Sequence, residues 1–169
     1  MAEKDVVIKE VIKYAGYGDF KNFYSYAHDC LKGEKYSVTE DSYTEKVKGS
    51  SKEVEIAWTA SKKLTDYFKV EIGVKWRILG MEDVDVEIDG KKKKMNKFAE
   101  VKIEAKGTLI HDYSNQWNKN AQTNFFKSLY NKYIIPDRTE QMKDKVEQDI
   151  KDFKEEMKAL MELTGKTAR

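Results

Sequence analysis

Residues 53–110 decide the fold of this chain, and they read EVEIAWTASKKLTDYFKVEIGVKWRILGMEDVDVEIDGKKKKMNKFAEVKIEAKGTLI. Apolar side chains occupy every second position in four successive segments, Val54–Ala60, Phe68–Ile78, Val84–Ile88 and Val101–Leu109. Such alternation is typical of strands that have one buried face and one solvated face, and therefore of an antiparallel sheet. A sheet with one apolar face needs a covering layer.

The end of the chain predicts that covering layer. Between about Asp137 and Thr164, apolar residues recur at intervals of three or four positions: Met142, Val146, Ile150, Phe153, Met157 and Leu160. This spacing places them in one stripe along a helix. We expect the stripe to pack on the inner face of the sheet. A shorter helical segment is expected from about Thr123 to Tyr133, and Pro136 separates it from the long helix.

Turn residues predict where the strands end. Gly80 is expected to end the strand that starts at Phe68, and Asp83 to open the next one. The pair Asp89-Gly90 predicts a tight hairpin turn, because both positions of such a turn need positive φ. Residues 91–97 are expected to lead into a last strand that starts at Phe98 and ends near Asp112.

The first part of the chain adds one helix and up to two strands. Residues Val6–Tyr14 fit either a strand or a helix, and their β-branched residues favour a strand. Asp19 is a suitable N-cap for a helix that ends near Lys32. A strand around Tyr43–Val47 follows. The fold class is therefore α+β, a curved antiparallel sheet of five to six strands packed on a long C-terminal helix.

Composition narrows the classes of function. The 169 residues are expected to form a single domain, 1–169, and carry 32 basic and 30 acidic side chains, a net charge of +2. This balance argues against a dedicated nucleic-acid protein, which usually has an excess of basic residues on one face. The single cysteine, Cys30, and the lack of an apolar signal segment or membrane span predict a cytoplasmic protein.

The predicted order of elements is a short strand, a helix, a curved antiparallel meander and a long C-terminal helix. This order resembles the helix-grip fold of the START-like superfamily, the lipid-transfer and polyketide-cyclase-like proteins. The resemblance implies an apolar cavity between the sheet and the final helix. The phrases VKWRILGM (Val74–Met81) and YNKYIIPDR (Tyr130–Arg138) also resemble small uncharacterised archaeal proteins, and this likeness implies no activity.

Residues that carry chemistry are sparse. His28 and Cys30 lie two positions apart on the predicted helix, so they point away from each other and form no nucleophile pair. His111 and Asp112 are strand neighbours that point to opposite faces. Two histidines without a cysteine cluster are too few for a zinc site. We therefore predict no catalytic residue, no metal and no cofactor, and we lean toward a protein that is not an enzyme.

Aromatic residues on the buried face are the best candidates for a binding site. A solid core would use them for packing, whereas a helix-grip protein would use them to line a pocket for an apolar small molecule or lipid. The candidate pocket residues are Tyr43, Trp58, Phe68, Trp76, Phe153 and Met157.

Two alternatives remain open. The chain could be an assembly protein that binds a protein partner, or itself, through a sheet edge or the terminal helix. It could also dock on RNA or a ribosome through Lys91, Lys92, Lys93 and Lys94, the single low-complexity feature of the chain. Such a run is more often a solvated loop that discourages edge pairing, so nucleic acid is the less favoured partner.

Overall fold

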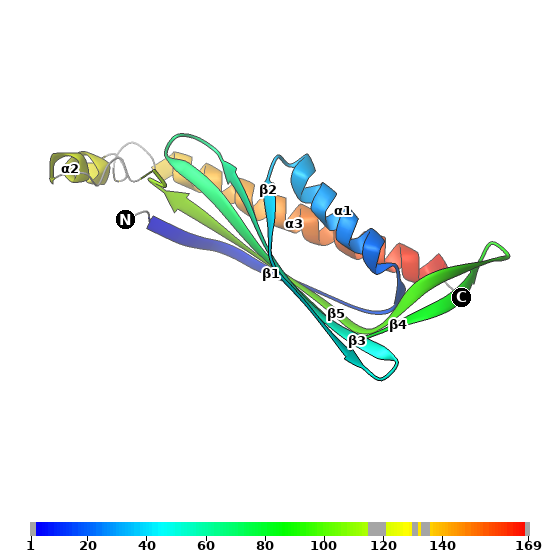
Figure 1. The fold of residues 1–169 in the computed structure, drawn as a ribbon. Helices are drawn as coiled ribbons and strands as arrows, with labels where there is room; N and C mark the ends of the chain where they lie inside the picture. Colours follow the sequence, from blue (N-terminus) through cyan, green and yellow to red (C-terminus); the bar gives the residue numbers. More distant parts are fainter. Residues whose placement is uncertain (1–2, 115–120, 130–131, 133–135, 168–169) are drawn as a thin grey trace.

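The computed structural model describes residues 3–114, 121–129, 132 and 136–167 (Figure 1). Five strands and three helices occur in this part of the chain. In chain order they are β1 (Glu3–Gly18), α1 (Phe20–Gly33), β2 (Ser37–Lys48), β3 (Ser51–Lys63), β4 (Phe68–Ile88), β5 (Lys91–His111), α2 (Ala121–Leu129) and α3 (Pro136–Thr167).

The strands form one antiparallel sheet in the order β1-β5-β4-β3-β2. The α+β prediction is therefore confirmed, and residues 6–14 belong to a strand that pairs with β5. The first and second strands lie at opposite edges of the sheet, so α1 spans the sheet between them. Figure 1 shows a strongly twisted sheet with α1 and α3 side by side on one face.

Two strand boundaries predicted inside the sheet are wrong. Gly80 does not end a strand, because β4 continues through it to Ile88 and keeps the same register with β5 on both sides. The glycine has a φ of +60°, a conformation that bends the strand and that other residues rarely adopt. Likewise, β5 starts at Lys91 rather than Phe98, since the lysines pair with the end of β4.

Local signals predicted the turn and the first helix correctly. Asp89 and Gly90 have φ values of +53° and +77° and join β4 to β5 in a tight hairpin. Asp19 is the N-cap of α1, and its side chain accepts a hydrogen bond from the backbone N–H of Asn22 at 3.4 Å. The buried face of α1 consists of Phe23, Ala27 and Leu31.

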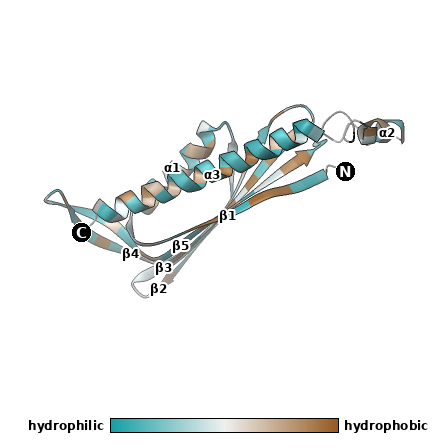
Figure 2. Cartoon of the chain, turned by 180° about the vertical axis from the view of Figure 1, so that it is seen from behind, coloured by the Kyte–Doolittle hydropathy of each residue, from teal (hydrophilic) through white to brown (hydrophobic). Residues whose placement is uncertain are grey.

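The long C-terminal helix lies on the inner face of the sheet, as predicted. Its buried residues are Val146, Ile150, Phe153, Met157 and Met161, and Met142 and Leu160 pack at the margin of the same core. The opposite side of α3 is hydrophilic (Figure 2). Among the described residues, no helix has the length and apolar character needed to cross a membrane.

A glycine in the sheet lets α3 approach closely. A methyl group added to Gly107 of β5 would overlap Ile150 Cδ1 and lie 2.7 Å from Val146 Cγ1. The side chains of α3 therefore fill the space above this strand. This contact is one reason why the apolar stripe of α3 sits directly on the sheet.

Candidate ligand-binding groove

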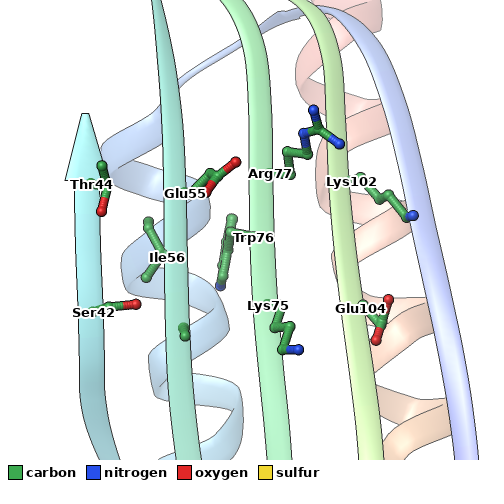
Figure 3. A pocket seen from close by; sticks show the side chains of 10 residues that line it. Ser42, Thr44, Glu55, Ile56, Lys75, Trp76, Arg77, Lys102 and Glu104 are labelled. Atoms are coloured by element: carbon green, nitrogen blue, oxygen red, sulfur yellow. The ribbon is translucent and has the colours of Figure 1, made fainter. Parts of the chain in front are cut away.

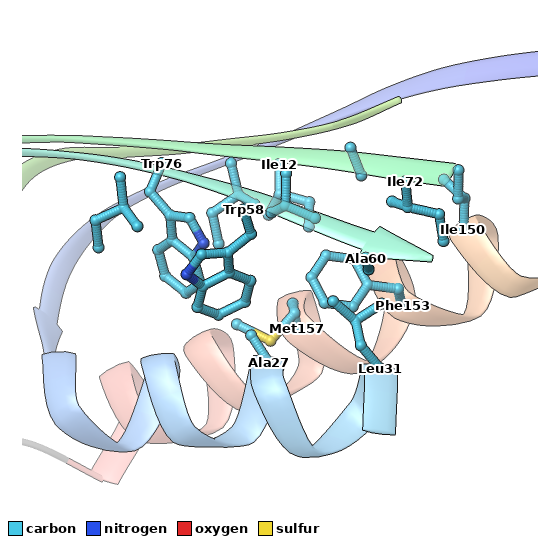
Figure 4. Close-up of a cluster of buried hydrophobic side chains, with 14 of the residues drawn as sticks. Ile12, Ala27, Leu31, Trp58, Ala60, Ile72, Trp76, Ile150, Phe153 and Met157 are labelled. Atoms are coloured by element: carbon cyan, nitrogen blue, oxygen red, sulfur yellow. The ribbon is translucent and has the colours of Figure 1, made fainter. Parts of the chain in front are cut away.

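Five of the six predicted pocket residues lie inside the hydrophobic core. Trp58, Phe68, Trp76, Phe153 and Met157 are all at most 4% exposed. The indole rings of the two tryptophans contact each other, with centroids 5.4 Å apart. Figure 4 shows them between the sheet and the two helices, near Met157. These side chains help to fill the space between the sheet and the two helices.

The first helix covers the tryptophans from outside. The ring of Tyr24 meets Trp58 edge-on at 4.9 Å, and Phe20 meets Trp76 at 6.4 Å. His28, one turn further along, lies 5.9 Å from Trp58. The sheet is thus covered by two helices rather than by the terminal helix alone, and an aromatic layer on α1 separates the tryptophans from solvent.

An open groove of about 990 Å³ begins where this aromatic layer ends. It lies between the N-terminal half of α1 and the ends of β2, β3, β4 and β5 that extend past this helix. Tyr43 is the one predicted pocket residue that borders it, and this side chain is 44% exposed. The lining residues are Asp19, Phe20, Lys21, Tyr24, Ser25, Tyr43, Glu45, Lys52, Met81, Asp83, Val84, Asp85, Lys94, Met95 and Asn96.

The bend at Gly80 helps to shape this groove. It directly precedes Met81, and the extended β4–β5 hairpin then carries its own small apolar cluster around Val86 and Met95. A Cβ at Gly80 would lie 2.7 Å from the Cβ of Ala99 on the paired strand. The bend therefore depends on glycine both for its φ angle and for its space.

Asn96 connects the elements on either side of the groove through hydrogen bonds. Its Oδ1 accepts a hydrogen bond from the backbone N–H of Phe20 at 3.0 Å, and its Nδ2 donates to Asp83 Oδ1 at 2.9 Å. One amide side chain thus links the start of α1 to both strands of the hairpin. It also satisfies one of the backbone N–H groups that a helix leaves open at its N-terminus.

One ion pair and two tyrosines mark the rim of the groove. Glu45 Oε1 lies 3.1 Å from Lys52 Nζ, and this hydrogen bond raises the pKa of Lys52. Tyr24 donates a hydrogen bond to Glu40. Burial first, and this bond second, raise the pKa of the Tyr24 hydroxyl. Burial and the nearby Glu45 carboxylate also raise the pKa of Tyr43.

A second, smaller hollow lies on the outer face of the sheet. It has a volume of about 290 Å³. Figure 3 shows Glu55, Lys75, Arg77, Lys102 and Glu104 around it, with both helices behind the strands. Glu55 lies opposite Arg77 and Lys75 opposite Glu104 on neighbouring strands, although Arg77 also lies opposite Lys102. Opposite charges on facing strands are usual on a solvated sheet face.

The lysine run lies in a strand rather than in a loop. Lys91–Lys94 form the start of β5 and are exposed. Lys94 pairs with Asp85 and Lys92 with Glu87 across the ladder. Opposite charges face each other on these strands, so the run presents less uncompensated positive charge than its sequence indicates.

Other chemical side chains take part in local contacts. The thiol of Cys30 donates to Glu156 Oε2 at 2.9 Å, and burial together with this carboxylate raises its pKa to about 12. His111 Nε2 lies 3.0 Å from Asp5 Oδ2. Within the described residues, no group of three or more histidine, cysteine or carboxylate side chains could hold a metal ion.

Comparisons of this chain with protein-family models, with curated proteins and with solved structures find no significant match. The groove must therefore be judged on its own chemistry. The sequence predicts the helix that carries Phe20 and Tyr24, but it gave no prediction of Met81, Met95 and Asn96 as lining residues. The only sequence signal near these residues was Gly80, and a glycine at that position is typical of a strand end.

Proposed function

We propose that this protein is a non-enzymatic module that binds an apolar small molecule or lipid in the groove beside α1. The observation that carries the proposal is the groove itself, whose volume of about 990 Å³ is at the upper end of what small-molecule sites need. The apolar part of its lining, called its floor below, consists of Phe20, Tyr24, Tyr43, Met81, Val84 and Met95, and the other nine lining residues are polar or charged. The site lies between the sheet and α1, because core side chains occupy the space under α3.

The chemistry of the groove supports binding over catalysis. At the rim, Glu45 and Lys52 form an ion pair and Asp83 accepts a hydrogen bond from Asn96, and the pKa values of Tyr24 and Tyr43 are both raised. We place the protein in the cytoplasm in this proposal, since its one cysteine leaves no internal disulfide to protect. A distant relation to the START-like proteins remains part of the proposal.

The test fills the groove without touching the core. Ser25 lines the groove from an exposed position on α1, and Asp29 is exposed one turn further along, outside the lining. Delipidated protein is titrated with the fluorescent probe N-phenylnaphthylamine. Ser25→Trp should weaken binding at least ~10-fold by occupying the site, whereas Asp29→Trp should not. Equal binding by wild type and Ser25→Trp, or no binding by wild type, would overturn the proposal.

We also propose self-association as a second candidate function, because α2 exposes apolar side chains. Phe125 and Phe126 are 61% and 57% exposed, with ring centroids 6.0 Å apart. Burial of each ring against a second copy would contribute about 1.5–3 kcal/mol. Light scattering should then give a mass that rises with concentration, and Phe125→Ser with Phe126→Ser should abolish the rise. A constant monomer mass at all concentrations would exclude this function.

A further inference from the structure

We infer that the ligand of the groove is an uncharged, flat, aromatic or conjugated molecule. This inference rests on the proposed function and names the chemical class that the groove would take. It follows from three properties of the site: the state of its charged groups, the residue types in its floor and the state of its hydrogen-bonding groups.

Four of the seven charged groups in the lining have a bonded partner within the protein. Glu45 and Lys52 form an ion pair, Asp83 accepts a hydrogen bond from Asn96, and Asp19 caps α1. Asp85 and Lys94 oppose each other in the ladder. An ionic ligand would have to disrupt one of these arrangements or enter the groove without a counter-charge, and an unpaired charge against an apolar floor is costly.

The balance of charge also disfavours anions. The lining contains four carboxylates and three ammonium groups, which are Asp19, Glu45, Asp83, Asp85, Lys21, Lys52 and Lys94. A fatty-acid carboxylate or a phosphate would therefore meet a weakly repulsive rim. A neutral ligand loses no ion pair and gains the full benefit of the apolar floor.

The floor favours π-systems over saturated chains. Three aromatic residues, Phe20, Tyr24 and Tyr43, line the groove together with two methionines, Met81 and Met95. Aromatic rings prefer edge-to-face or offset partners, and methionine sulfur makes favourable contacts with ring edges. Phe20 and Tyr24 are themselves fixed by edge contacts with Trp76 and Trp58, so these rings are pre-positioned rather than mobile.

Two of the polar side chains that line the groove are already bonded within the protein. Both ends of the Asn96 amide are bonded within the protein, and the Tyr24 hydroxyl donates to Glu40. A ligand rich in hydroxyl or amide groups would lose its hydrogen bonds to water without replacing them. The ligand therefore carries few polar groups, such as a single carbonyl or hydroxyl.

The experiment uses two probes with the same ring skeleton. N-phenylnaphthylamine is neutral, and anilinonaphthalenesulfonate adds one sulfonate to it. Fluorescence titration of the full chain should show that the neutral probe binds at least ~10-fold tighter than the sulfonate. A sulfonate that binds equally or more tightly would overturn the ligand class, as would tighter binding of a naphthalene that bears a trimethylammonium group. Failure of every probe would overturn the proposed function itself.

A variant sharpens the result. Glu45→Gln leaves Lys52 without its carboxylate partner, so the sulfonate should bind about 3–5-fold tighter while the neutral probe changes less than about 2-fold. Glu71→Gln is the matched control. Glu71 Oε2 lies 3.9 Å from Lys4 Nζ, so the substitution also removes the partner of a lysine, and Glu71 does not line the groove. Neither probe should respond to this substitution. If Glu45→Gln leaves the affinity for the sulfonate unchanged, the Glu45–Lys52 ion pair does not exclude anionic ligands and this part of the inference is wrong.

Discussion

The hydroxyl of Tyr36 donates a 2.7 Å hydrogen bond to Asp149 Oδ2, across 113 residues of sequence. Lys62 Nζ lies 3.7 Å from the same oxygen and also donates to the backbone carbonyl of Glu34 at 2.9 Å. The segment after α1 is thereby joined to α3 and to β3. Burial, followed by the Asp149 contact, raises the pKa of the Tyr36 hydroxyl, so this residue donates at all physiological pH values.

Tyr36→Phe should therefore destabilise the protein by about 1.5–3 kcal/mol, because it removes a buried hydrogen bond to a charged group. Urea unfolding followed by circular dichroism measures the change at constant m-value. Tyr26→Phe on the exposed side of α1 is the control and should change stability by less than about 0.5 kcal/mol. Equal stability of the two variants would contradict the role of the bond.

Gly107→Ala should destabilise the protein by about 1–3 kcal/mol, since the added methyl group forces Ile150 and Val146 away from the sheet. The measurement is again the urea midpoint. Gly73→Ala is a matched control in the neighbouring strand, because its Cβ would meet no atom within 4 Å. If both glycines tolerate alanine equally, α3 does not rest on β5 as described.

Asn96→Ala should loosen the start of α1. The substitution frees the backbone N–H of Phe20, so its amide should exchange with deuterium faster, and the neutral probe should bind more weakly. Asn22→Ala, exposed in the first turn of α1, is the control and should leave both readouts unchanged. Protection of the Phe20 amide in Asn96→Ala would show that the helix start is held by other contacts.

The thiol of Cys30 should react with iodoacetamide slowly at neutral pH. Because its pKa is about 12 in the folded protein against about 9 for a free thiol, few molecules carry the reactive thiolate. The rate should still be rising steeply between about pH 9 and about pH 10, where a free thiol approaches its plateau. A rate that levels off near pH 9 would contradict this.

The same shift has a defined effect on stability. Below about pH 9 the thiol is protonated in both folded and unfolded chains, so it contributes no pH dependence there. Above this value the unfolded chain loses the proton first, and stability falls as pH rises toward 12. Glu156→Gln should reduce this fall, because the Glu156 carboxylate adds to the effect of burial in raising the pKa.

The sheet and the covering helix were predictable because their signals are periodic. Alternation over residues 54–109 and the stripe on α3 each repeat many times, so individual exceptions do not hide them. Asp19 and Asp89-Gly90 were predictable because caps and tight turns depend on one or two residues. These features are local, and the sequence carries them directly.

The groove was not predictable, for a physical reason. It depends on a glycine that bends a strand without ending it, and the sequence signal of Gly80 is the same in both cases. Trp58 and Trp76 were assigned correctly to the inner face, but the sequence could not reveal that α1 lies over them. Tyr43 belongs to an edge strand, where one side is open, and this position depends on the strand order.

The first helix is fastened at both ends, by Asn96 at its start and by the Tyr36–Asp149 contact just after its end. A helix held at both ends cannot move outward as a lid. If the groove binds a ligand as proposed, that ligand would enter and leave through the side of the groove that faces solvent, without a movement of α1. The rate of ligand dissociation would then follow from the affinity of the groove, because no conformational step would precede it. Such kinetics suit a protein that buffers or transfers its ligand.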